Sequence, residues 1–250
     1  MEKTVAKAMK ALELLCRTEA PLGVTQIARE LELNKSNVHR VLGTLLALGY
    51  VRRAEKAAYA PSLKLYELGA LVWSRNDLGR VAKPHLDELC ARTGETVFVT
   101  VLDGCDVLYL EKQESAHPVR IAATVGGRLP SYCSASGRVL LAYASDGAQR
   151  VQDIKFVRHT PNTITSAKEL RLALDKVRRQ GFELSVEEYM ADVCGLAVPI
   201  RGGTGDVRAA LGLAALKRRL SDANVKRLLA ALRETADRIA YDAGYRDGRS

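Results

Sequence analysis

Residues 22–51 read LGVTQIARELELNKSNVHRVLGTLLALGYV and hold two helical patterns joined by a short turn. In the second pattern, over about 35–48, apolar residues recur at the i, i+3, i+4 and i+7 positions of one helix face. Asn34 stands just before it, where a short side-chain acceptor can satisfy the free amides of a first helical turn. The first pattern, over about 25–32, also has one apolar face. Together they predict a helix-turn-helix.

The flanking segments extend this motif. Residues 3–17 carry another amphipathic helical pattern. After Gly49, two short extended pieces within 50–60 surround a polar turn, which predicts a small hairpin. Helices followed by a basic hairpin are typical of a winged helix-turn-helix, and we assign this domain to residues 1–62.

Polar and basic side chains occupy the surface that such a domain presents to DNA. Ser, Asn and Arg side chains can read base edges in the major groove, and cationic side chains on the hairpin can meet phosphates. The candidate DNA-binding residues are Thr25, Gln26, Lys35, Ser36, Asn37, His39, Arg40, Thr44, Arg52, Arg53 and Lys56. Residues 1–60 hold ten basic and six acidic residues, a net charge of only +4. A scaffold for protein contacts therefore remains an alternative at this point.

The rest of the chain predicts a linker and a second domain. Residues 63–77 form a helical pattern that is apolar on nearly all sides, which indicates a linker helix that packs against a partner chain. Residues 78–250 mix helical patterns with short extended runs, including a hairpin around Asp103–Asp106 and a strand over 119–125. A capping box of Ser166 and Glu169 begins one of the helices.

Composition excludes several other classes of protein. The 250 residues are 47% hydrophobic and 27% charged, with a net charge of +9, as in a core-forming chain with an anionic partner. No signal peptide and no apolar run of about 20 residues is present, so we expect a soluble, cytoplasmic protein. The five cysteines are odd in number and lack C-x-x-C spacing, and the histidines share no helix face. We therefore expect no disulfide framework, metal, cofactor or catalytic residue.

Several motifs resemble one family. Residues 22–31, 34–42 and 48–51 resemble the reader domain of the isocitrate lyase regulator (IclR) family of bacterial transcription factors. Further matches follow in the family's order at Gly126–Pro130, Ser134–Arg138, Gln180–Phe182, Glu187-Glu188 and Leu196–Ile200. The resemblance implies an α+β protein with an N-terminal winged helix, a dimerising linker helix and a C-terminal α/β (GAF-like) effector-binding domain with an antiparallel sheet. It also implies dimers or tetramers on pseudo-palindromic operator DNA.

The start of the helix after residue 134 is the candidate effector site. Free amides and the helix dipole at such an end can hold an anion, although Ser134 or Ser136 could instead only cap the helix. The resemblance implies that the backbone around Ala135 and Ser136 contacts the carboxylate of a small organic acid. It places Leu129 in the wall of the same pocket.

This chain departs from the better-known carboxylate-sensing members of the family. Aligned without gaps, Ser185 falls where those members have an acid, Gly195 where they often have Cys, and Gly212 and Ala214 where they have serines. Strand alternation turns Cys194 to the opposite face from Gly195. We therefore expect a wider, less polar pocket for an acid larger than glyoxylate or pyruvate, that is, an aromatic or otherwise bulky acid. Tyr132 and Val193 are expected to add wall surface.

The sequence thus predicts a DNA-binding transcriptional regulator, a repressor of a catabolic operon, controlled by a small organic acid. Two alternatives stay open here. One is a small-molecule enzyme with an appended helical adaptor, although the sequence shows no G-x-S-x-G nucleophile elbow. The other is a protein-interaction module whose winged helix binds no DNA.

Overall fold

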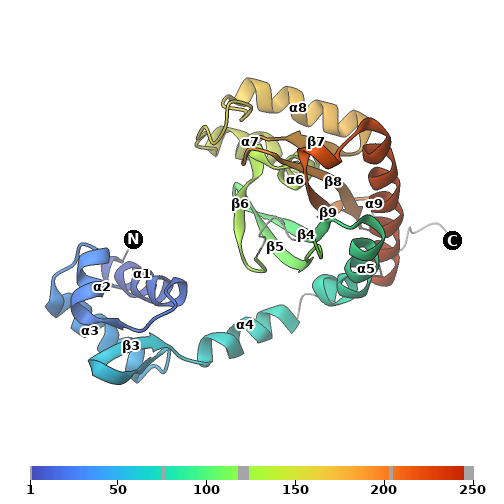
Figure 1. Ribbon diagram of the computed structural model, residues 1–250. Coiled ribbons are helices and arrows are strands. Elements are labelled where there is room, and N and C mark those ends of the chain that lie inside the picture. The colour runs from blue at the N-terminus through green and yellow to red at the C-terminus, as the bar shows by residue number, and fades with distance from the viewer. Residues whose placement is uncertain (1, 75–76, 118–123, 203–204, 245–250) are drawn as a thin grey trace. The chain divides into compact units, whose positions relative to one another are not determined.

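In the computed structural model, the chain forms two compact units, Met1–Asn76 (unit 1) and Asp77–Ser250 (unit 2). The structure describes residues 2–74, 77–117, 124–202 and 205–244 (Figure 1). The strand predicted over 119–125 falls largely on residues 118–123, which lie outside the described residues.

Unit 1 is a winged helix-turn-helix followed by one more helix. Its helices are α1 (Lys3–Arg17), α2 (Val24–Glu30), α3 (Lys35–Ala47) and α4 (Lys64–Ser74). Its strands are β1 (Leu22–Gly23), β2 (Val51–Arg53) and β3 (Ala58–Pro61), with the short 3-10 helix η1 (Glu55–Ala57) in the wing between β2 and β3. The sheet order is β1-β3-β2, and both pairings are antiparallel.

The local signals in the sequence explain this unit. The Asn34 side chain accepts a hydrogen bond from the Asn37 amide at 3.0 Å, so the predicted N-cap of α3 is confirmed. The inward face of α3 is fully or nearly fully buried in a core shared with α1 and α2. Strand β1 was not predicted, because two residues next to Pro21 were interpreted as a turn. Its pairing of Leu22 with Tyr59 depends on a partner far along the chain.

Unit 2 is a layered α/β domain. Its strands are β4 (Thr96–Asp103), β5 (Asp106–Gln113), β6 (Arg128–Pro130), β7 (Glu183–Val186), β8 (Val193–Arg201) and β9 (Val207–Leu216). Its helices are α5 (Asp77–Thr93), α6 (Ala135–Tyr143), α7 (Gly147–Asp153), α8 (Ala167–Gln180) and α9 (Asp222–Asp242), with the 3-10 turns η2 (Ser131–Cys133) and η3 (Lys217–Arg219). The sheet order is β6-β5-β4-β9-β8-β7 and every pairing is antiparallel, so the predicted α+β class is confirmed.

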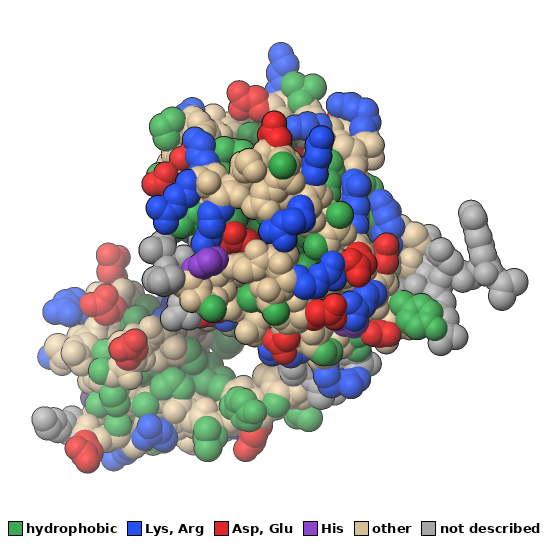
Figure 2. All heavy atoms as spheres, turned by 45° about the vertical axis from the view of Figure 1, so that its right-hand side comes forward, with side chains coloured by type: hydrophobic (Ala, Val, Ile, Leu, Met, Phe, Trp, Pro, Cys, Tyr) green, Lys and Arg blue, Asp and Glu red, His purple; other side chains and the backbone are tan. Residues whose placement is uncertain are grey.

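Helices cover both faces of this sheet. Helices α5 and α9 pack together and against one face, whereas α6 crosses the other face and α8 packs on α6 (Figure 1). Because α6 is covered on both sides, its residues from Ala135 to Ala142 are all buried. Figure 2 shows basic and acidic side chains interspersed over the outer surface of this unit. Ion pairs such as Arg92–Glu234 join α5 to α9.

The sheet face beneath α6 is lined with small residues where the three strands β7, β8 and β9 meet. Ser185 pairs with Gly195, and Gly195 pairs with Ala214, so these three side-chain positions form one row across the sheet. The next row joins Ala197, Gly212 and Phe98. We call this patch of small residues on β7, β8 and β9 the bare floor. Its short side chains leave space between the sheet and the start of α6.

Candidate functional site

The outward face of α3 is polar and accessible. Lys35, Ser36, His39, Arg40 and Thr44 are exposed, while Asn37 is half-buried. No acidic residue lies in the first turn of α3. The Arg40 guanidinium lies 3.5 Å from the Asn37 amide oxygen, so these two base-reading candidates contact each other. One face of α3 therefore holds the core, and the other offers hydrogen-bonding groups to a groove.

A cleft brings several of the other candidates together. It is lined by the start of α2, by α3 and by the wing, and its candidate residues are Thr25, Gln26, His39 and Arg53. The Gln26 side chain accepts a hydrogen bond from the Gly23 amide at 2.9 Å, so its oxygen is engaged in closing the start of α2. Arg52, next to Arg53 on β2, is exposed as well. Lys56 belongs to η1, and its side chain lies outside what the structure describes.

Unit 2 contains a cavity of about 240 Å³ between the bare floor, the start of α6 and the β7–β8 loop. The predicted effector residues that line it are Leu129, Ala135, Ser136, Ser185, Val193, Gly195 and Ala214. Cys194 also borders the cavity, although strand alternation places its side chain on the opposite face of β8.

Two predicted wall residues are not among the described residues that line this cavity. The Tyr132 hydroxyl donates to the Val157 carbonyl at 2.8 Å and accepts from the Val157 amide at 2.9 Å, so it fixes the segment after α7. The Phe98 ring occupies the space where a side chain at position 212 would lie, since a Cβ on Gly212 would be 2.5 Å from that ring. Phe98, which sequence reasoning missed, lines the cavity in its place.

Gly195 has a different role from the widening that the sequence suggested. A Cβ at this position would lie 2.8 Å from the Ser185 hydroxyl oxygen and 3.3 Å from the Ala135 Cβ. The space above Gly195 is therefore already filled, and the glycine lets the start of α6 approach β8 closely.

The start of α6 presents unbonded donors. The Ser134 side chain caps the helix by accepting from the Gly137 amide at 3.2 Å, and the first intrahelical bond runs from the Arg138 amide to the Ser134 carbonyl. The amides of Ala135 and Ser136 precede that bond and have no acceptor within the helix. Ser136 is only 3% exposed, and its hydroxyl has no hydrogen-bond partner within the described ranges. Of the two serines that could cap the helix, Ser134 is the one that does so.

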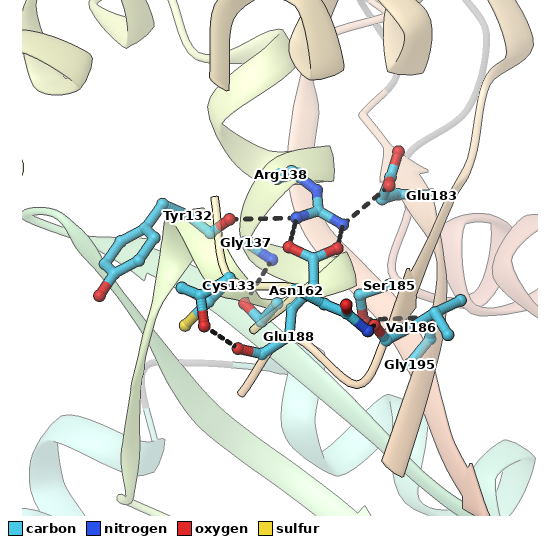
Figure 3. A network of polar contacts seen from close by, with 12 residues as sticks. Tyr132, Cys133, Gly137, Arg138, Asn162, Glu183, Ser185, Val186, Glu188 and Gly195 are labelled. Carbon is cyan, nitrogen blue, oxygen red and sulfur yellow. Dashed lines mark hydrogen bonds and ion pairs between the residues drawn. The ribbon is translucent and has the colours of Figure 1, made fainter. Parts of the chain in front are cut away.

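A buried ion cluster ties α6 to the far side of the cavity (Figure 3). The Arg138 guanidinium is 1% exposed and contacts Glu183 at 2.9 Å and Glu188 at 2.6 Å, and it also donates to the Tyr132 carbonyl at 3.1 Å. Glu188 lines the cavity, and its carbonyl accepts from the Thr163 hydroxyl at 2.6 Å. Sequence reasoning quoted Arg138 and Glu188 only as parts of motifs, because nothing local links positions 50 residues apart.

The cluster of Arg138, Glu183 and Glu188 contains more carboxylates than cations. Two carboxylates share one guanidinium, and burial raises the pKa of Glu183 even though Arg138 acts to lower it. One oxygen of Glu183 is buried without a hydrogen-bond partner in the described structure. The cluster is therefore stable only while all three groups stay together.

Other kinds of site find no support in the parts of the chain that the structure describes. No helix there is long and apolar enough to cross a membrane. Within the same ranges, no group of three or more His, Cys, Asp or Glu side chains is placed to hold a metal ion.

A winged helix joined in one chain to a cavity-bearing α/β unit defines a ligand-sensing DNA-binding protein. Residues 4–55 match the IclR helix-turn-helix domain, and residues 70–241 match the bacterial transcriptional regulator IclR C-terminal domain. The chain belongs to the IclR family of transcriptional regulators and is not an enzyme.

Individual relatives agree with this assignment. The HTH-type transcriptional regulator KdgR of Escherichia coli K12 is 34% identical over 232 residues, which cover 92% of this chain and 88% of that protein. The crystal structure of the Thermotoga maritima IclR is similar with a TM-score of 0.79 and 27% identity, covering 98% of this chain and 100% of that one. An IclR homologue from Microbacterium hydrocarbonoxydans, complexed with 4-hydroxybenzoate, is similar with a TM-score of 0.80 and 29% identity, covering 96% and 98%.

Replacing the buried guanidinium tests the ion cluster. Arg138→Met leaves two carboxylates without a counter-charge, and we expect unit 2 to lose about 3–5 kcal/mol of stability at pH 8. Without Arg138, burial raises the pKa of Glu183 further. The folded variant then binds protons more tightly than the unfolded chain, so its stability increases as the pH falls. Urea denaturation from pH 8 to 5.5, followed by hydrogen exchange of α6 and β7, measures this recovery.

Arg178→Met is the matched control. Arg178 is exposed, pairs with Asp175 on α8 and donates to the Ala142 carbonyl at 2.7 Å, so its loss should lower stability by about 1 kcal/mol with no comparable recovery at low pH. Equal losses in the two variants would contradict the role given to Arg138.

Proposed function

We propose that this IclR-family regulator is a cytoplasmic repressor of a catabolic operon, and that a small organic acid bound in the cavity of unit 2 controls its affinity for operator DNA. One observation carries the effector part of this proposal. The start of α6 lines the cavity and holds two amides without an acceptor in the helix, together with the buried hydroxyl of Ser136. Three donors at the positive end of a helix are suited to a carboxylate.

The size and lining of the cavity favour an aromatic acid. Its volume of about 240 Å³ exceeds the roughly 150 Å³ of a cavity that holds benzene. Away from α6 the apolar side chains Phe98, Leu129, Met190 and Val193 lie around the bare floor, and the polar residues Thr124, Arg128, Ser185 and Glu188 complete the lining. The similar Microbacterium protein, complexed with 4-hydroxybenzoate, supports the same class of ligand.

For the DNA contacts, we assign base reading to the exposed face of α3 around Ser36, Asn37 and Arg40. Lys35 and the wing residues Arg52 and Arg53 then bind phosphates. The remaining candidates, at the start of α2 and along α3, position the domain on the duplex.

The linker helix is the proposed contact between two copies of the chain. Leu63, just before α4, is 79% exposed, and Tyr66 and Val72 on α4 are 75% and 69% exposed. Apolar side chains are also visible over the surface of unit 1 in Figure 2. A second copy that covers this face would form the dimer that reads two operator half-sites, with tetramers built from such dimers. In this arrangement residues 1–62 read DNA, 63–77 link the copies and 78–250 sense the effector.

Specific DNA binding tests the function as a whole. We expect purified protein to prefer the DNA upstream of its own gene or of neighbouring catabolic genes over a scrambled duplex in fluorescence anisotropy at fixed salt. Equal affinity for both duplexes would instead favour the protein-interaction module.

Substitutions in α3 and in the wing should distinguish base reading from phosphate binding. Arg40→Ala should weaken specific binding by about 1–3 kcal/mol if its guanidinium pairs with a base. Arg53→Ala should instead lower the slope of log affinity against log salt by about 1. Arg29→Ala is the control, because this exposed side chain of α2 pairs with Glu30 and has no assigned contact with DNA. Operator affinity that is unchanged in Arg40→Ala would exclude its assigned role.

Calorimetric titration should identify the class of effector. We expect benzoate-type acids to bind, and short 2-oxo acids such as pyruvate to bind more weakly because they leave the apolar lining uncovered. Ser136→Ala should lower the affinity for the acid about 10-fold or more, since a hydrogen bond to a charged group contributes about 1.5–3 kcal/mol. Benzyl alcohol, which lacks the carboxylate, is the matched control ligand. Tight binding of the short acids alone would contradict the aromatic assignment.

A further inference from the structure

Another polar group of the cavity is the Tyr109 hydroxyl, which belongs to the same face of the sheet as α6 but to a strand three positions away from β8. Tyr109 on β5 lines the cavity, and its ring packs edge-on against Phe98 with centroids 5.0 Å apart. Its hydroxyl makes no hydrogen bond to any residue that the structure describes. A half-buried phenol beside an apolar slot is therefore available to a ligand.

The surroundings of Tyr109 keep its hydroxyl neutral and close to the cavity. Burial raises the pKa of Tyr109 to about 12, with smaller contributions from Tyr189 and Cys133, which line the same cavity. Burial also raises the pKa of the Cys133 thiol to about 12. At neutral pH the phenol therefore stays protonated and can donate a hydrogen bond as well as accept one.

Strand order sets the distance between the two polar ends. The start of α6 lies over β8, since a Cβ at Gly195 would be 3.3 Å from the Ala135 Cβ. Tyr109 is on β5, and the order β5-β4-β9-β8 puts three strand spacings, roughly 14 Å of backbone, between them. A ring with its carboxylate at α6 would extend across β9 and β4, beside Phe98, with its opposite end toward the Tyr109 hydroxyl.

The lack of a side chain at Gly212 shapes the part of the cavity between the start of α6 and Tyr109. The Phe98 ring occupies the space where a side chain at 212 would lie, so the ring lies low against β9 instead of filling the cavity. The resulting slot runs between a carboxylate-binding end and a phenol, with apolar walls between them. A ligand that fits it carries polar groups at both ends and none in the middle.

We propose that Tyr109 determines specificity by hydrogen-bonding a hydroxyl or carbonyl group at the end of the effector opposite its carboxylate. This inference rests on the proposed function, because it presumes that an acid binds at α6. The preferred ligands are then aromatic acids with a polar group in the para position. Acids without such a group, or with it in the ortho position, leave the phenol without a partner.

Calorimetric titration of the full-length protein with matched acids tests this proposal. Because 4-hydroxybenzoate and 4-methylbenzoate are nearly equal in size, a difference between them reports the hydrogen bond. We expect wild-type protein to bind 4-hydroxybenzoate about 10-fold more tightly than 4-methylbenzoate, benzoate or 2-hydroxybenzoate. This comparison needs no variant and is independent of any effect on folding.

Two variants then locate the contact. Tyr109→Phe removes only the hydroxyl and should abolish the preference for 4-hydroxybenzoate while leaving benzoate affinity within about 2-fold. Tyr189→Phe is the matched control, because Tyr189 lines the cavity but is 42% exposed with its ring against His159, and it should keep the preference.

The outcomes separate this proposal from the one it rests on. Loss of the preference in Tyr109→Phe alone supports the assignment. Equal binding of 4-hydroxybenzoate and 4-methylbenzoate by the wild type, or an unchanged preference in Tyr109→Phe, overturns it while acid binding at α6 stands. If no aromatic acid binds the wild type, both proposals are overturned.

Discussion

The buried guanidinium of Arg138 is the interaction on which the sensing unit depends. It connects α6, whose first turn carries the proposed anion donors, to Glu183 on β7 and to Glu188 in the β7–β8 loop. These segments form two sides of the same cavity. A charge buried this deeply is tolerated only with its partners in place. The position of the free amides and the closure of the cavity are thus fixed by one shared cation.

This arrangement also gives a physical route from ligand to regulation. A ligand can shift a conformational equilibrium only by binding the two states with different affinities. In the proposed binding mode, a carboxylate at the start of α6 and a ring between Phe98 and the β7–β8 loop would contact segments that Arg138 holds together. A shift of α6 relative to that loop would therefore change the affinity for the acid. In the proposed dimer, the linker helix would transmit that shift to the winged helices and so change their binding to DNA.

Local patterns in the sequence predicted most of the fold. The helix periods of unit 1, the Asn34 cap and the hairpin around Asp103–Asp106 depend on neighbours within a few residues, and all are present. Strands β6 and β7 and helix α7 were not predicted, because segments of three to seven residues are too short to show a clear hydrophobic period. The same distinction between local and tertiary interactions applies to the candidate site. The free donors of α6 followed from helix geometry, whereas the Arg138 cluster and the roles of Tyr132, Gly212 and Phe98 followed from tertiary packing.

The central claim is that occupancy of the cavity changes binding to DNA, and it can be measured directly. Operator DNA is titrated with protein in fluorescence anisotropy at fixed salt, with and without an acid at a concentration that calorimetry shows to be saturating. We expect a shift of about 5- to 150-fold in operator affinity, and in Ser136→Ala the concentration of acid that produces half of this shift should rise about 10-fold. Operator affinity that stays the same when the cavity is demonstrably filled would contradict it.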